Sequence, residues 1–236
     1  MDISFQSLFF FIIITILYFV FPNIGKPQLT IADLEETAQI DFYIKKMKSL
    51  AFYLGAVVFS QLFLNIGFLM SKCGGSLDQN IGSAAIFTFI PWILIFGCML
   101  AVLIIFPGFK SAFSDVIGYY AISRKANDLL NLILKDREIN EAIENDTNGT
   151  NKSELSSAAD AIIKICGNKS LIINQIDPDN FKDMWETFKP LMKNMEIYND
   201  NSKEGLKQQL LDLVVIKDNI GEAIWYIYTC ILISSI

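Results

Sequence analysis

Three long apolar stretches near the N-terminus constrain the fold of this chain more than any other feature. They cover about residues 3–22, 49–70 and 83–106, and none has a charged residue in its interior. Because an α-helix rises about 1.5 Å per residue, each stretch comes close to the roughly 20 residues that cross the apolar core of a bilayer. The pattern predicts an all-α protein with three transmembrane helices followed by a mostly helical soluble domain.

The composition changes near Pro107, where the chain becomes polar. We therefore expect a membrane region at 1–106 and a helical domain at 107–236, which is long enough to fold compactly. Periodic apolar residues predict helices at about 114–136, 154–166 and 180–197, the last interrupted by Pro190, and from 203 onward. The closing segment 223–236 is uncharged but short for a span. It fits a buried core helix, a segment on the membrane surface or a fourth crossing.

The first apolar stretch also has features of a cleaved signal peptide, since it starts at the N-terminus. However, the residue that precedes it is the acidic Asp2, and no small-residue cleavage site follows it. Signal peptides begin with basic residues and end at such a site. We therefore expect this stretch to remain in the protein as a helix.

Basic residues predict the orientation, because Lys and Arg near a span collect on the cytosolic side. Several lysines lie between the first and second stretches, whereas only Lys72 lies between the second and third. The segment after the third stretch is basic again, with Lys110, Arg124 and Lys125. The N-terminus is thus expected to be lumenal, and the first loop and 107–236 cytosolic. In the cytosol no glycan is added to sequons, which here begin at Asn145, Asn148, Asn151 and Asn168.

The chain has no histidine, which removes the usual general base and a common zinc ligand. Its cysteines form no C-x-x-C pair; they are Cys73, Cys98, Cys166 and Cys230. A net charge of −6 argues against nucleic acid, since phosphate binding needs clustered Lys and Arg. We therefore expect a structural protein with no catalytic residue, metal, cofactor or small-molecule substrate. A membrane-embedded lipid enzyme would have to work without histidine and without carboxylates in its spans.

Polar and helix-bending residues inside the second and third stretches predict where these helices pack. Gln61 and Asn65 can hydrogen-bond a neighbouring helix. Pro91 removes one backbone hydrogen bond and should kink the third helix beside Trp92. Gly97 favours the close approach of another helix. We expect these residues to shape the packing of the spans.

The third stretch and its flanks carry a more specific pattern. It consists of Cys73-Gly74-Gly75, the run Thr88–Gly97 and the junction Phe106–Ser114. These segments resemble a family of membrane proteins from nucleocytoplasmic large DNA viruses, in which a T-x-x-P-W-x-x-I-F-G span precedes an F-P-G-W-x-x-P-F-S-N-T-F-G junction. The chain differs from the family at Phe109, which replaces Trp, and at Ala112, which replaces Pro.

The resemblance implies a minor capsid protein in the internal membrane of the virion, which derives from the host endoplasmic reticulum. Such a protein would anchor the lipid bilayer to the icosahedral shell, with the major and other minor capsid proteins as partners of 107–236. Aromatic residues are the candidates for this contact, and they are Tyr119, Tyr120, Trp185 and Phe188. The alternative is a scaffold or channel-forming protein of a cellular organelle membrane.

Overall fold

The computed structural model describes residues 3–134, 169–189, 192 and 205–235. These residues form helices, turns and loops, with one isolated antiparallel bridge between Leu134 and Met192, so the all-α prediction is confirmed for them. The helix predicted at 154–166 and the sequons lie outside the described residues. The chain divides into two compact units: unit 1 contains 1–28, 37–113 and 219–236, and unit 2 contains 29–36 and 114–218.

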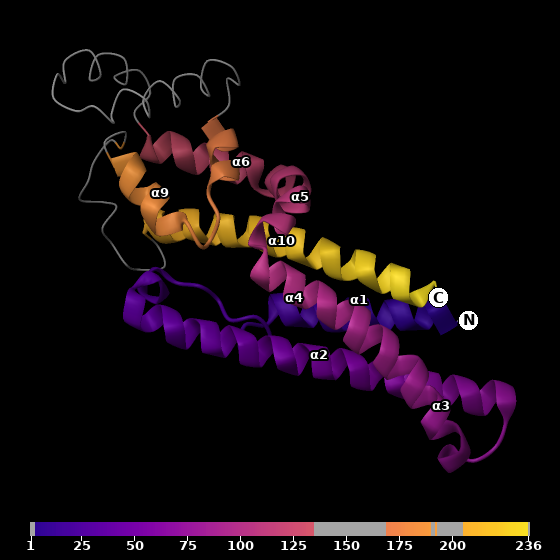
Figure 1. Cartoon of the computed structure of the whole chain (residues 1–236). Coiled ribbons are helices and arrows are strands. Elements are labelled where there is room, and N and C mark those ends of the chain that lie inside the picture. The colour runs from indigo at the N-terminus through magenta and orange to yellow at the C-terminus, as the bar shows by residue number, and fades with distance from the viewer. Residues whose placement is uncertain (1–2, 135–168, 190–191, 193–204, 236) are drawn as a thin grey trace, which may run out of the picture. The chain divides into compact units, whose positions relative to one another are not determined.

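Unit 1 is a bundle of long helices (Figure 1). It contains α1 (Ile3–Val20), α2 (Glu36–Cys73), α3 (Leu77–Phe89), a π-helical segment (Ile90–Phe96), α4 (Gly97–Ile105) and the C-terminal part of α10 (Leu206–Ser234). Figure 1 shows the yellow end of α10 beside α1, with both chain ends together. In agreement, the hydroxyl oxygens of Ser7 and Ser234 lie 3.5 Å apart.

Two helices of unit 1 are long and apolar enough to cross a membrane. They are α2, with 38 residues, and the continuous helix Leu77–Ile105, with 29 residues. The second apolar stretch lies within α2, and the third lies within the Leu77–Ile105 helix except for its last residue, Phe106. The first apolar helix, Ser4–Val20, is shorter, so its crossing stays a prediction.

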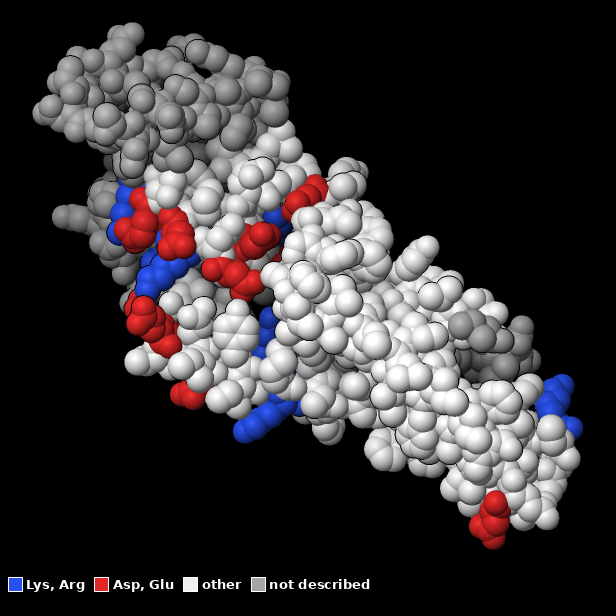
Figure 2. All heavy atoms as spheres, viewed as in Figure 1, with Lys and Arg blue, Asp and Glu red and all other residues white. Residues whose placement is uncertain are grey.

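The side chains of unit 1 are apolar on the outside and partly polar on the inside. Phe52, Phe63 and Phe87 are 68%, 70% and 65% exposed, whereas Gln61 and Thr88 are 2% and 0% exposed. Figure 2 shows a largely uncharged surface (white) over α1, α3 and α4. The buried core is rich in aromatic residues, among them Phe11, Tyr18, Tyr53, Trp92, Phe96 and Tyr226. This distribution is the reverse of that in a soluble bundle, whose outward face is polar.

Two breaks separate the long helices of unit 1. Gly74 and Gly75 form the turn between α2 and α3 with φ angles of 69° and 86°, a region that is open mainly to glycine. After α4 the backbone leaves the helical region at Phe106. A 3-10 segment, Pro107–Lys110, and the short α5, Ser111–Phe113, then complete this part of unit 1.

Unit 2 consists of shorter elements around its own core. They are two 3-10 segments (Ile31–Leu34 and Lys169–Gln175), a π-helical turn (Ser114–Gly118), α6 (Tyr119–Ile133), α9 (Phe181–Phe188) and the first part of α10. The core contains Ile122, Leu129, Leu130, Ile133, Ile173, Phe181, Trp185, Leu210 and Val214. At Gly118 an added Cβ would lie 2.5 Å from the carbonyl oxygen of Lys217, so the two helices meet there with no room for a side chain.

The units differ from the predicted division at residue 107. Residues 107–113 belong to unit 1, and so does the end of α10, where Tyr226, Cys230 and Ile233 are buried in the core. The segment 223–236 therefore packs with the N-terminal helices and not in a separate polar domain. In unit 2, α9 ends at Phe188, and most of the remainder of the helix predicted at 180–197 lies outside the described residues.

Candidate functional sites

A cavity of about 720 Å³ lies in unit 1 between α1, α2, the α3–π-helix segment and the end of α10. Its volume is typical of small-molecule sites, which span about 300–1,000 Å³. Gln61, Asn65, Pro91 and Trp92, which the sequence predicts as packing residues, all line this cavity. The structure thus brings together residues from two different spans.

The polar residues of α2 tie it to both neighbouring helices. Ser7 Oγ donates to Gln61 Oε1 at 2.6 Å, and Gln61 Nε2 donates back to the carbonyl oxygen of Ser7 at 3.1 Å. Asn65 Nδ2 donates to Thr88 Oγ1 at 2.9 Å. Each residue makes the interhelical hydrogen bond expected of it, which links α1 to α2 and α2 to α3.

Pro91 was predicted to kink the third helix, and in the structure it lies in a π-helical segment. A proline cannot donate a backbone hydrogen bond, and a π-helical turn is a common way for a helix to absorb this loss. Trp92 is 2% exposed, and its ring centroid lies 5.5 Å from that of Phe11 on α1. The prediction for Gly97 is not met, because a Cβ added there would find no atom within 4 Å. No helix approaches Gly97 closely in the described structure.

A buried ion pair ties the loop after α1 to α10 in unit 1. Lys26 Nζ lies 2.7 Å from Glu222 Oε2, and the two side chains are only 9% and 8% exposed. The hydroxyl of Tyr226 donates to the other carboxylate oxygen of Glu222. Burial alone would raise the pKa of Glu222, but the charges of Lys26 and Lys110 outweigh it and lower that pKa to about 2. The carboxylate is therefore ionised at neutral pH.

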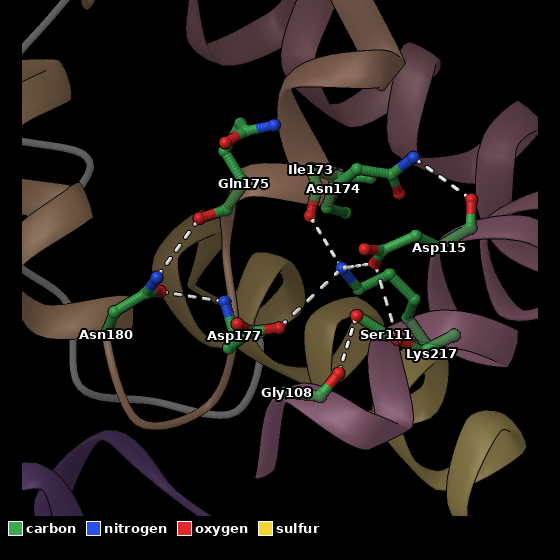
Figure 3. Close-up of polar contacts among 10 residues, drawn as sticks. Gly108, Ser111, Asp115, Ile173, Asn174, Gln175, Asp177, Asn180 and Lys217 are labelled. Atoms are coloured by element: carbon green, nitrogen blue, oxygen red, sulfur yellow. Dashed lines mark hydrogen bonds and ion pairs between the residues drawn. The ribbon is translucent and has the colours of Figure 1, made fainter. Parts of the chain in front are cut away.

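A second buried lysine organises unit 2 (Figure 3). Lys217 on α10 is 0% exposed, and its Nζ donates to Asp115 Oδ1 at 2.9 Å and to the carbonyl oxygen of Ile173 at 3.1 Å. Asp177 Oδ1 lies 3.9 Å away. Asn174 Nδ2 donates to the carbonyl oxygen of Asp115, which ties the same segments together. One ammonium group thus joins three segments that are far apart in sequence.

The aromatic residues predicted to contact a partner lie in different environments. Tyr120 is 83% exposed, whereas Tyr119 is half-buried and its hydroxyl lies 2.8 Å from Ser170 Oγ. Trp185 and Phe188 are 2% and 8% exposed, because α9 turns this face into the core of unit 2. Burial removes these two residues from the candidates for a partner contact, which leaves Tyr120 as the most accessible of the four.

No protein-family model matches the chain, and neither a curated protein nor a solved structure matches it. Within the described ranges, no group of three or more Cys, Asp and Glu residues gathers to hold a metal ion. The viral family therefore stays a prediction from the sequence segments quoted above.

Neither Lys217 nor the pair of Lys26 and Glu222 was predicted from the sequence. A signal for Lys217 exists, since it follows Leu210 and Val214 at helical spacing on the buried face of α10. A charge at such a position requires a buried partner. The pair of Lys26 and Glu222 carries no comparable signal, because its members are 196 residues apart.

Proposed function

We propose that the protein is a non-enzymatic membrane anchor, with the long apolar helices of unit 1 in the bilayer and unit 2 outside it. The observation that carries this proposal is the inverted side-chain distribution of unit 1. Phe63 and Phe87 face outward, while Gln61 and Thr88 are buried and hydrogen-bonded to other helices. Lipid favours such an arrangement, because polar groups in a bilayer have to be paired inside the bundle.

In this proposal α1, α2 and the Leu77–Ile105 helix cross the bilayer, and the uncharged end of α10 crosses it with them as a fourth span. The excess of lysines in the first loop and after α4 supports a cytosolic position for unit 2. Because the end of α10 lies beside α1 with the chain ends together (Figure 1), both chain ends would be lumenal.

We also propose that unit 2 binds shell proteins of a virus particle, so that the chain links the internal membrane to the capsid. The resemblance to viral membrane proteins supports this, and so do exposed apolar side chains in the π-helical turn and the first turn of α6. Val116, Ile117 and Tyr120 are 66%, 46% and 83% exposed there. Such side chains on a polar unit are typical of protein contacts. An internal membrane from the endoplasmic reticulum keeps its cytosolic leaflet outward, toward the shell.

Chemical cross-linking of intact, purified virus particles tests the shell contact. We expect peptides of unit 2 to be joined to major or minor capsid proteins. Tyr120→Ser should weaken these cross-links and leave the amount of chain in the membrane unchanged. Leu132→Ser is the matched control, since Leu132 is 60% exposed on the same helix but lies three turns away. Absence of the chain from the particles, or cross-links only to genome-associated proteins, would contradict the proposal.

A channel is the second candidate, because the cavity of unit 1 contains Gln61 and Asn65. In a channel these positions would lie on a continuous water-filled path. Cysteine substitution at Asn65 followed by a membrane-impermeant thiol reagent separates the two functions. Rapid labelling from the aqueous phase would favour a channel, and protection would favour the anchor.

A further inference from the structure

Two polar groups that line the cavity of unit 1 have no hydrogen-bond partner among the described residues. Asn65 donates to Thr88, but its Oδ1 accepts no hydrogen bond from the described residues. The hydroxyl of Ser4, which also lines the cavity, has no hydrogen-bond partner in the same part of the chain. In a bilayer, bulk water does not satisfy such groups, and each unpaired one is costly. A bound molecule with hydroxyl groups would pair them.

The residues that line the cavity indicate what kind of ligand it would bind. None of the described residues that line it is charged, so an anionic headgroup would find no counter-charge. Ser4 and Ser7 lie about one helical turn apart on α1, and Gln61 and Asn65 lie one turn apart on α2. Polar side chains spaced in this way on two neighbouring helices suit a headgroup with several hydroxyls. The remaining walls are mainly apolar and suit a hydrocarbon chain.

The cavity opens onto the apolar outer surface of unit 1. Phe68, Ile86, Phe87 and Ile90 line it, yet they are 38%, 60%, 65% and 55% exposed. These residues therefore form its rim between α2 and α3. A lipid molecule would enter through this rim from the surrounding bilayer without passing through water.

We propose that this cavity binds a monoacylglycerol, an uncharged lipid with two free hydroxyls and one acyl chain. The glycerol hydroxyls would pair with Ser4 and Asn65, and the chain would lie along Phe87 and Ile90. The inference rests on the proposed membrane location of unit 1 and is independent of the partner of unit 2.

Photo-cross-linking of the full chain in phosphatidylcholine nanodiscs tests the site. The probe is a monoacylglycerol that carries a diazirine and an alkyne in its acyl chain. We expect labelled peptides around Phe68 and around 86–90, and displacement of the label by unlabelled monooleoylglycerol but not by oleate. Asn65→Leu and Ser4→Leu should each lower labelling about fivefold, the worth of one net hydrogen bond. Ser83→Leu, at an exposed position of α3 outside the cavity, should label like the wild type.

Three results would overturn the inference: label spread over outward positions such as Phe52 and Phe63, equal displacement by oleate, or unchanged labelling of both Asn65→Leu and Ser4→Leu. Membrane insertion is measured separately in each variant by resistance to alkaline extraction. A chain that resists extraction but takes no specific label contradicts only the lipid site. A wild-type chain that is extracted contradicts the membrane location itself.

Discussion

Replacing Lys26 by Met should destabilise unit 1, because it leaves the buried Glu222 carboxylate without its closest counter-charge. Breaking a buried ion pair from one side costs about 3–5 kcal/mol. The charge of Lys110 and the hydroxyl of Tyr226 still act on Glu222 in the variant, so we expect the lower end, about 3 kcal/mol. For a chain of this length that corresponds to a fall of about 6–12 °C in the midpoint of thermal unfolding.

The pH dependence of this loss identifies its cause. The pKa of Glu222 is about 2 in the folded protein and 4.5 in the reference state, so ionisation of this group stabilises the fold above pH 4.5. The difference corresponds to about 3 kcal/mol, which disappears as the pH falls from 4.5 towards 2. In Lys26→Met the folded-state pKa of Glu222 rises, and this contribution is lost at all pH values. The stability difference between wild type and variant should therefore shrink in acid.

Thermal unfolding of the purified protein in nanodiscs, followed by intrinsic fluorescence between pH 2.5 and 7, measures both effects. Lys45→Met is the matched control, because Lys45 is an exposed lysine of α2 whose loss should change stability by less than about 0.5 kcal/mol. If Lys26→Met melted like the wild type at pH 7, or if its deficit stayed constant down to pH 2.5, the ion pair would not have the role assigned to it.

Three further perturbations test other contacts. Asp115→Ala should lower the free energy of unfolding of unit 2 by about 2–3 kcal/mol in denaturant unfolding, because the Lys217 ammonium stays buried with one close partner fewer. Lys217→Met removes the buried charge itself and should lower that free energy by less. A larger loss for Lys217→Met than for Asp115→Ala would contradict this prediction. Gly118→Ala should cost about 1–3 kcal/mol because its Cβ would meet α10, while Gly108→Ala, with no atom within 4 Å, should melt like the wild type. Pro91→Ala should leave membrane insertion intact but change disulfide cross-linking between α2 and the π-helical segment, and unchanged cross-linking would mean that the proline is incidental.

Local patterns predicted the helical elements well. The apolar stretches predicted α1, α2 and the Leu77–Ile105 helix, although the last two helices begin before their stretches. Gln61 and Asn65 were identified because a polar side chain in an apolar helix needs a partner on another helix. Their meeting with Pro91 and Trp92 in one cavity depends on how three helices pack, which spacing along one helix does not determine.

Long-range pairing explains what the sequence analysis missed. The end of α10 has the composition of a core helix, a surface segment or a span. The contacts of Tyr226 with Phe19, Tyr53 and Phe96 place it in unit 1. Lys217 pairs with Asp115, which lies 102 residues earlier in the sequence. The burial of Trp185 and Phe188 follows from the orientation of α9 against the core of unit 2, which an amphipathic pattern alone leaves open.

Protease protection in sealed microsomes, combined with alkaline extraction, tests the membrane anchor most directly. The full chain carries one epitope tag at the C-terminus and another inserted between Asn148 and Gly149. If unit 1 is embedded and unit 2 is cytosolic, the chain stays in the membrane pellet at alkaline pH. Added protease then removes the internal tag and leaves the C-terminal tag in a protected fragment. Release of the chain by alkali, or protection of the internal tag, would contradict the anchor and its orientation.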